Sequence, residues 1–212
     1  KGRLHATHNP KGVIDKITIH HVAGVLSIET LGNVFAPATR KASSNYGVGN
    51  DGRIGMYCEE KDRSWCTSSA ANDYRAITIE VSNSKTGGNW PVSDKALQAL
   101  INLCVDICKR NGIKKLNYTG NKSGNLTMHK WFSNTNCPGP YLESKFPYIA
   151  AEVNKRLGGG TTTPTPSKPA DPAPGKDYTV RVTAEALNYR SGPGTSHKVN
   201  GTIRDKGIYT IT

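Results

Sequence analysis

One segment of this chain limits its fold more than any other. It runs from Gly158 to Lys176, GGGTTTPTPSKPADPAPGK, and consists almost wholly of Gly, Thr, Pro, Ala and Ser. Such a segment has no apolar face to bury, so it is predicted to be an extended linker of up to about 60 Å, at about 3.1 Å per residue. The chain of 212 residues is therefore expected to fold as two unequal parts, residues 1–157 and 177–212.

The first part contains three stretches with the character of strands. Lys16 to His21 has the length and the Ile/Thr content of a core strand, and Arg75 to Ser84 is predicted to be another buried strand. Asn45 to Glu60 is predicted to form two strands joined across Asn50-Asp51-Gly52, because Asp-Gly supports a tight hairpin turn.

Three helices are predicted among these strands. The clearest is Asp94 to Asn111, where Ser93 can cap the N-terminus and Gly112 can close the C-terminus. Cys104 and Cys108 belong to its apolar stripe and are assigned to the core. The other two predicted helices cover Ser27 to Phe35 and Pro147 to Leu157. Strands that alternate with helices indicate an α/β fold with a central mixed β-sheet flanked by helices.

The balance of charge narrows the classes of partner. With 28 Lys and Arg against 16 Asp and Glu, the formal net charge of +12 predicts attraction to polyanions such as anionic lipid or the anionic polymers of a cell wall. Nucleic acid is the least favoured partner, because no Lys/Arg-rich block is interleaved with aromatic residues. A merely basic surface explains the charge equally well.

The N-terminal stretch and the cysteines bear on the cellular compartment. KGRLHATHNP contains no apolar run, so neither a signal peptide nor a transmembrane span is predicted. Five cysteines, an odd number at irregular spacings, argue against a disulfide framework and indicate synthesis in a reducing cytosol. At least one of them is expected to be a free thiol or a metal ligand.

Two imidazoles and one thiol stand where strands or loops are predicted to end. They are His20 or His21, His129 in LTMHKWF, and Cys137 in TNCPGP. Two His nitrogens and a Cys sulfur are a standard Zn²⁺ ligand set that leaves a fourth tetrahedral position for water. The spacing alone is a modest signal, because chains of this size commonly contain scattered histidines.

The order of four motifs is more specific than any single residue. The motifs ITIHHVAG, SNYGVGNDGRI, TIEVSN and MHKWFSNTNCPGPYL closely resemble the zinc amidase family of phage endolysins, autolysins and peptidoglycan recognition proteins. The resemblance covers His20 to about Leu157 and implies an α/β fold with a zinc cleft. It also implies that His20, His129 and Cys137 bind the zinc. His21 then points elsewhere, because adjacent residues of a strand face opposite sides.

The resemblance also implies roles around the zinc ligands. Glu80 matches an acidic residue that acts as general base, and the alternative is a structural carboxylate that pairs with Arg75. Tyr46 matches a tyrosine that lines the zinc cleft, and the alternative is a half-buried strand aromatic. Thr135 stands where the family often has a basic residue that stabilises the oxyanion. Either the Thr135 hydroxyl stabilises the oxyanion more weakly than a basic residue would, or another residue supplies the positive charge. Lys130 is one candidate for that residue.

Three further side chains have two interpretations each. Trp65 falls in the stretch that lines the substrate groove of similar enzymes, or it fills the core. Cys58 and Cys66 are predicted to be buried thiols rather than a second metal pair, because no histidine or further cysteine lies near them in the sequence to complete a set of four ligands.

The resemblance implies an N-acetylmuramoyl-L-alanine amidase that uses zinc-activated water to cut the amide between N-acetylmuramic acid and L-alanine in bacterial peptidoglycan. The expected protein is an endolysin or autolysin, made in the bacterial cytoplasm and acting on the cell wall after release or secretion. Two alternatives stay open. One is a non-catalytic peptidoglycan-binding or recognition protein, which Thr135 favours, and the other is a cysteine peptidase built on Cys137 and His129.

The second part has the pattern of an all-β segment. Residues 177–212 alternate apolar and polar side chains and contain a turn at Ser191-Gly192-Pro193-Gly194. The stretch LNYRSGPGTSHKVNGTI resembles the bacterial SH3-like domain that binds cell walls. Such a barrel needs roughly 60 residues, so a partial SH3-like domain is predicted. Completion of its sheet by another copy of the chain is left open, and so is the oligomeric state.

Overall fold

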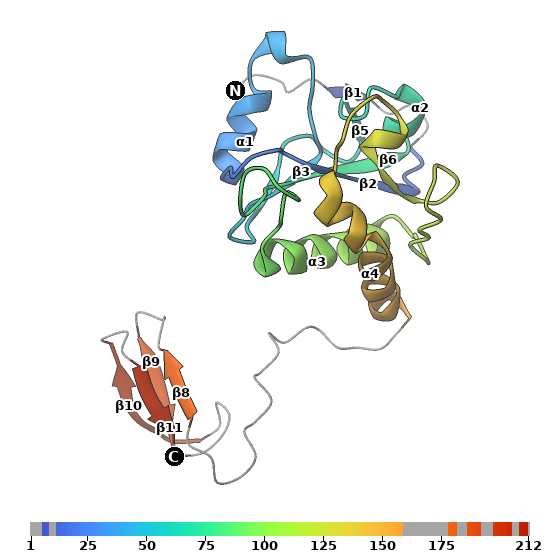
Figure 1. Cartoon of the computed structure of the whole chain (residues 1–212). Coiled ribbons are helices and arrows are strands. Elements are labelled where there is room, and N and C mark those ends of the chain that lie inside the picture. Colours follow the sequence, from blue (N-terminus) through green and yellow to red (C-terminus); the bar gives the residue numbers. More distant parts are fainter. Residues whose placement is uncertain are drawn as a thin grey trace. The chain divides into compact units, whose positions relative to one another are not determined.

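The computed structural model describes residues 6–8, 12–158, 178–181, 186–191, 197–204 and 208–211. The chain divides into two compact units, Lys1–Thr161 and Thr162–Thr212. The first contains a five-stranded sheet and its helices, and the second contains strands β8 to β11 (Figure 1). Of the linker predicted over Gly158 to Lys176, only Gly158 is among the described residues, so the predicted extent of the linker stays a prediction.

A mixed sheet organises the first unit. Its strands lie in the order β4-β3-β6-β2-β7, in which β3, β6, β2 and β7 are parallel and β4 is antiparallel to β3. Their bounds are Lys16–His21 (β2), Tyr46–Val48 (β3), Ile54–Met56 (β4), Ala76–Val81 (β6) and Leu126–Met128 (β7). This is the mixed α/β sheet that the sequence predicts, and the carboxyl ends of its four parallel strands lie at one edge.

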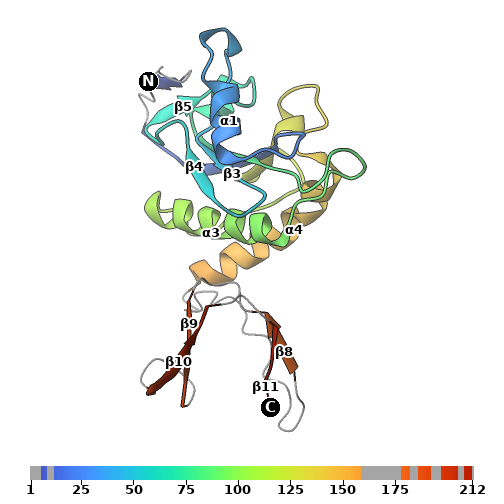
Figure 2. The same cartoon turned by 90° about the vertical axis from the view of Figure 1, so that its left-hand side faces the viewer.

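One face of this sheet is apolar and packs on two long helices, α3 (Asp94–Arg110) and α4 (Gly139–Leu157), which Figure 2 shows beneath the strands. Every second residue of the four parallel strands enters this core, as the alternation of side chains along a strand requires, whereas Ile54 and Met56 of β4 are exposed. The strand residues with at most 1% exposure on this face are Ile17, Ile19, Val48, Ile77, Ile79, Val81, Leu126 and Met128.

The opposite face carries a buried layer of hydroxyl groups. Thr18 of β2 hydrogen bonds to Thr127 of β7 across 2.8 Å, and Thr78 of β6 hydrogen bonds to Ser64 across 2.7 Å. Because these groups are fully buried, the bonds between them replace the water that they lose on folding. Short elements cover this face: α1 (Ile28–Phe35), α2 (Ala70–Asp73), and β1 (Ala6–His8) paired with β5 (Asp62–Ser64).

Two of the three predicted helices are confirmed almost to the residue. α3 begins after Ser93, whose side chain accepts a hydrogen bond from the backbone N–H of Ala96 and so caps the helix. Both cysteines of its apolar stripe are fully buried. α1 begins after Ser27, whose side chain caps the helix in the same way by accepting from the N–H of Thr30.

The predicted start of the third helix is wrong. α4 begins at Gly139, and Pro147 lies inside it rather than in its first turn. Leu142 and Phe146 extend the buried stripe of Ile149 towards the N-terminus, so burial stabilises the additional turns. Pro147 has no backbone N–H, so the carbonyl four residues before it has no helical partner. Because Pro147 is exposed, water can reach this turn of the helix.

The predicted hairpin is confirmed by the pairing of β3 with β4. Gly52 in its turn has a φ of 86°, a conformation that glycine adopts without steric cost. Asp51 stabilises the turn by accepting a 3.0 Å hydrogen bond from the backbone N–H of Arg53.

The described strands of the second unit form two antiparallel pairs. β9 (Leu187–Arg190) pairs with β10 (Val199–Ile203), and β8 (Tyr178–Arg181) pairs with β11 (Ile208–Ile211). These strands agree with the all-β pattern, while the resemblance to an SH3-like domain stays a prediction. Among the described residues of the whole chain, no helix combines the length and the apolar character that crossing a bilayer requires.

Candidate metal centre

Polar residues line up at the edge where the parallel strands end. In the register of the sheet, His20 of β2 lies opposite Glu80 of β6, and Glu80 lies opposite Gly47 of β3. His129 follows directly on Met128, the last residue of β7. Paired residues of neighbouring strands share a face, so His20 and Glu80 project on the side of the hydroxyl layer. Crevices at the carboxyl ends of parallel strands are common ligand sites.

His20, His129 and Cys137 form a compact group, which we call the ligand cluster. One donor atom from each lies within 4.8 Å of the other two. Nδ1 of His20 is 3.6 Å from Sγ of Cys137, and the two imidazole centroids are 4.7 Å apart. His20 is 1% exposed and Cys137 is 8% exposed. The structure thus brings His20 together with two side chains that lie more than a hundred residues further along the sequence.

The electrostatics of the ligand cluster suit a metal ion. Burial lowers the pKa of His20 well below its usual range, and the neighbouring His129 and His21 lower it further. Burial also lowers the pKa of His129. Both imidazoles are therefore neutral at pH 7, which is the form that binds a metal. Nε2 of each of these two imidazoles is shielded from solvent and has no hydrogen-bond partner in the part of the chain that the structure describes.

The Cys137 sulfur is held in place by the backbone around it. The backbone N–H of His21 donates to Sγ across 3.4 Å, and the N–H of Cys137 donates to the Thr135 hydroxyl across 3.2 Å. The carbonyl of Cys137 accepts a 2.9 Å bond from the N–H of Lys130. Burial and the Glu80 carboxyl raise the pKa of this thiol, and a coordinated metal ion deprotonates such a thiol.

Glu80 lies beside the ligand cluster with one oxygen uncommitted. Its Oε1 is 3.8 Å from the Cys66 thiol, and its Oε2 is shielded from solvent without a hydrogen-bond partner among the described residues. Burial raises the pKa of this carboxyl to about 8. The alternative pairing of Glu80 with Arg75 is not seen, because Arg75 forms an ion pair with Asp15.

Thr135 and Lys130 both lie near the ligand cluster but in different situations. The Thr135 hydroxyl accepts the hydrogen bond from Cys137 and keeps its own hydrogen for donation. Lys130 is next to His129 in the chain, but its Nζ is 2.9 Å from both carboxylate oxygens of Glu143. The positive charge of Lys130 is therefore paired with a carboxylate.

The structure does not bring Tyr46 to the ligand cluster. Tyr46 precedes Gly47, which lies opposite Glu80, so the Tyr46 side chain projects from the other face of the sheet. Its hydroxyl donates a 2.9 Å hydrogen bond to Glu60, whose carboxylate also pairs with Arg110 across 2.6 Å. This position corrects the expectation that Tyr46 lines the cleft and agrees with the alternative of a strand aromatic.

Trp65 lies next in the chain to Cys66, whose thiol contacts Glu80. Its backbone N–H donates to the hydroxyl of Ser43 across 2.9 Å, and the guanidinium of Arg63 lies 6.0 Å from the indole centroid. The side chain is half-buried, so the core interpretation and the groove interpretation both stay open. Cys58 is remote from these groups, because its thiol contacts the backbone carbonyls of Glu59 and Asp62.

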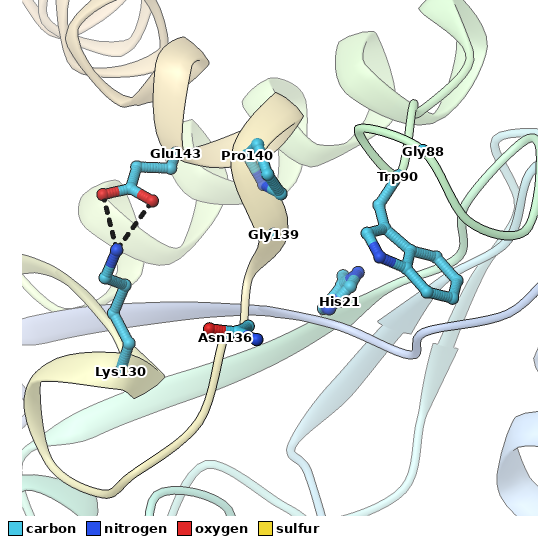
Figure 3. A pocket seen from close by; sticks show the side chains of 8 residues that line it. All are labelled: His21, Gly88, Trp90, Lys130, Asn136, Gly139, Pro140 and Glu143. Atoms are coloured by element: carbon cyan, nitrogen blue, oxygen red, sulfur yellow. Dashed lines mark hydrogen bonds and ion pairs between the residues drawn. The ribbon is translucent and has the colours of Figure 1, made fainter.

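A pocket of about 380 Å³ lies beside the ligand cluster (Figure 3). Three of its lining residues, His21, Lys130 and Asn136, are direct sequence neighbours of the three cluster residues. The imidazole of His21 meets the indole of Trp90 edge-on, with centroids 5.3 Å apart. His21 thus projects away from the ligand cluster, as predicted, and forms a pocket wall. The remaining lining residues are Gly88, Gly139, Pro140 and Glu143.

Three residues at or near the site, Cys66, Trp90 and Asn136, do not stand out in the sequence. No sequence pattern marks Asn136 or Trp90 as a site residue, because polar loop residues and isolated aromatic residues are common in proteins. Cys66 was considered only with Cys58, its neighbour in the sequence. The partner that matters is Glu80, and their proximity depends on how the loop of Cys66 packs over β6.

Two imidazoles and a thiol match the donor set of a single-metal hydrolytic site, and here they lie at the strand ends of a mixed α/β sheet. Residues 10–140 match the family model described as N-acetylmuramoyl-L-alanine amidase. The match covers more than half of the chain, which therefore belongs to this family.

Solved structures show the same fold. One is the N-acetylmuramoyl-L-alanine amidase LysC from Clostridium intestinale URNW, with 17% identity and a TM-score of 0.54 over 73% of this chain and 93% of that chain. The Staphylococcus aureus hydrolase AmiA in complex with its ligand has 18% identity and a TM-score of 0.57, over 73% and 78% of the two chains. The PlyG catalytic domain has 19% identity and a TM-score of 0.57, over 75% and 92%. No curated protein matches the sequence.

Proposed function

We propose that this protein is a zinc-dependent peptidoglycan hydrolase that cleaves the amide between N-acetylmuramic acid and L-alanine. The observation that supports this most is the convergence of His20, His129 and Cys137 in a chain of the N-acetylmuramoyl-L-alanine amidase family. Zinc fits these residues, because two neutral imidazoles with unpartnered nitrogens and a buried thiol form a tetrahedral ligand set with one position left over. When bound there, zinc supplies a Lewis acid and a water of lowered pKa.

Glu80 is the proposed general base. Its free Oε2 can accept a proton from the attacking water and pass it to the amine that leaves with L-alanine. Burial raises the pKa of this carboxyl, which makes its deprotonated form a stronger base for this transfer.

Thr135 is the proposed donor to the developing oxyanion. Its hydroxyl hydrogen is not used in the bond with Cys137, and the backbone around Cys137 fixes its position. A neutral hydroxyl is a weaker donor than a lysine, and Lys130 is paired with Glu143 instead. Tyr46 has no part in this proposal, since its hydroxyl lies on the other face of the sheet.

The pocket in Figure 3 is the proposed binding site for the peptide stem. It offers an aromatic wall in Trp90, a carboxylate in Glu143 and an amide in Asn136, so it can hold both apolar and polar parts of a peptide. Trp65 is proposed to contact the substrate from the side of the cluster where Cys66 lies.

The cysteine peptidase alternative has less support than the metal site. A nucleophilic thiol needs a lowered pKa, whereas burial raises the pKa of Cys137. The alternative of a non-catalytic binding protein still depends on Thr135, and an assay of hydrolysis distinguishes it from the enzyme.

The test is digestion of purified bacterial cell walls, with the products analysed by mass spectrometry. We expect stems with a new N-terminal L-alanine, complete loss of their release with a zinc chelator, and recovery when zinc is returned. Wall binding without new amino groups would identify a non-catalytic protein. Hydrolysis that persists after zinc removal, and that thiol alkylation stops, would identify a cysteine peptidase.

A further inference from the structure

A second set of donor atoms lies beside the ligand cluster and shares one residue with it. A ring nitrogen of His20, the Cys66 sulfur and a carboxylate oxygen of Glu80 all lie within 4.8 Å of one another. His20 lies at the end of β2, Glu80 lies opposite it on β6, and Cys66 follows shortly after β5. The proposed hydrolysis uses His20 and Glu80 but has no role for Cys66.

Two of these three side chains have polar atoms without partners. His20 is 1% exposed, and its Nε2 has no hydrogen bond to any residue that the structure describes. The Glu80 Oε2 atom is also shielded from solvent and unpartnered among the described residues. Buried polar atoms are normally paired, so these two atoms point to a ligand that completes them. The Cys66 thiol lies 3.8 Å from the other oxygen of the same carboxyl.

We propose that His20, Cys66 and Glu80 form a second position for a soft divalent cation such as Zn²⁺ or Cd²⁺, called here the Cys66 position. One imidazole, one thiolate and one carboxylate are all ligand types that zinc accepts. Both positions include His20, so a cation can pass between them while it keeps that imidazole as a ligand.

Binding in the Cys66 position changes the protonation of the thiol. A cysteine that holds no metal is a protonated thiol, whereas the form that binds a metal is the thiolate. A divalent cation displaces this proton into solvent and binds the thiolate. The same cation binds Glu80 as the carboxylate, so any proton on that carboxyl is also released to solvent, and the bound carboxylate cannot accept a proton from water. The Cys66 position therefore holds the enzyme inactive, a consequence that rests on the proposed function, whereas the binding itself does not.

The test uses the full chain with Cys137→Ser, which removes the only thiol of the ligand cluster. After loading with Cd²⁺ and dialysis, we expect this variant to retain cadmium and to show the ultraviolet charge-transfer absorption of a cadmium–thiolate bond.

The double variant Cys66→Ser/Cys137→Ser should lose the absorption. Cys58→Ser/Cys137→Ser is the matched control and should keep it, because the Cys58 thiol contacts only backbone carbonyls that a serine hydroxyl also reaches. Glu80→Gln in the Cys137→Ser background should weaken cadmium binding at least about tenfold.

Loss of cadmium or of the thiolate absorption in folded Cys137→Ser would overturn the proposal, and so would an absorption that survives in Cys66→Ser/Cys137→Ser. If Cys137→Ser does not fold, as circular dichroism would show, His129→Ala provides the same test. There, cadmium should protect Cys66 from alkylation, and protection of Cys137 alone would overturn the proposal. The two proposals can fail separately. If the cadmium–thiolate absorption depends on Cys66 but the unmodified protein does not hydrolyse cell walls, the Cys66 position is supported and the proposed function is refuted.

Discussion

His20 is the side chain that the two donor sets share. We therefore expect His20→Ala to lose stoichiometric zinc, while His129→Ala keeps a weaker site at His20, Cys66 and Glu80. Elemental analysis after dialysis measures both. His197→Ala, an exposed position in the second unit, is the control and should keep full zinc. Full zinc in His20→Ala would contradict the assignment of both positions.

Glu80 is proposed to move a proton and not to hold the catalytic zinc. Glu80→Gln should therefore keep one zinc per chain and lower kcat about 10²- to 10⁴-fold, which is the range for a lost general base. Glu59→Gln is a matched control, because Glu59 is exposed and pairs with Lys61. Loss of zinc in Glu80→Gln, or near-normal turnover, would show that the carboxylate has another role.

The raised pKa of Glu80 also predicts how the stability of the metal-free protein depends on pH. Burial raises this pKa from 4.5 to about 8, so the folded state binds the proton more tightly than the unfolded state. The contribution of this group to stability is complete below pH 4.5 and is lost as the pH rises towards 8. The free energy of unfolding should fall by up to about 1.4 kcal/mol per pH unit in that window because of this one group.

Urea unfolding of metal-free protein and of Glu80→Gln at several pH values measures this effect. The variant lacks the titrating group, so its curve should be flatter between pH 5 and about 8, and at pH 8 it should be the more stable of the two. Parallel curves would show that Glu80 titrates normally in the folded protein.

At the scale of the elements, β3 depends on a glycine that faces the cleft side of the sheet. A Cβ on Gly47 would lie 2.6 Å from the Tyr57 hydroxyl and 2.7 Å from Cδ2 of Leu31, so α1 can approach the strand only because this side chain is absent. We expect Gly47→Ala to lower the free energy of unfolding by about 1–3 kcal/mol. Gly24→Ala, whose Cβ would have only contacts of 3.8 Å or more, is the control. Chemical denaturation of both variants tests the difference.

The sequence predicted the elements whose pattern is local. The strand β2, the helix α3 with its Ser93 cap, and the hairpin turn at Gly52 each follow from neighbouring residues, and all three are present. The three proposed zinc ligands each stand in a recognisable motif, and the structure brings their side chains together.

What the sequence could not predict depends on register and packing. Tyr46 and Glu80 lie on opposite faces because Gly47, and not Tyr46, is opposite Glu80, and the pairing of β3 with β6 follows from no local pattern. The start of α4 was missed because Pro147 favours a first helical turn, whereas the burial of Leu142 and Phe146 extends the helix past it. The proximity of Cys66 to Glu80 is of the same kind, since packing of a loop produces it.

At the scale of the whole molecule, the two compact units should be separable. The first contains the complete mixed sheet, both long helices and every residue of the ligand cluster. A chain that ends at Thr161 should therefore keep zinc and the thermal unfolding midpoint of the first unit, and should hydrolyse soluble muropeptides at an unchanged rate. If the second unit binds walls, as its SH3-like pattern predicts, activity on intact walls should fall.

Calorimetry and assays on the two substrates measure these effects. A shortened chain that loses its zinc would show that the first unit does not stand alone. Equal loss of activity on soluble and wall substrates would place the role of the second unit in turnover rather than in attachment.

The arrangement of the pocket ties its shape to the ion. His21, Lys130 and Asn136 line the pocket, and each is one peptide bond away from a residue that is proposed to bind the metal. An ion that prefers longer bonds or other angles than zinc would turn His20, His129 and Cys137, and their neighbours would turn with them. Exchange of the metal should consequently alter which peptide stems are accepted as well as how fast they are released, so the ion would act as a determinant of selectivity.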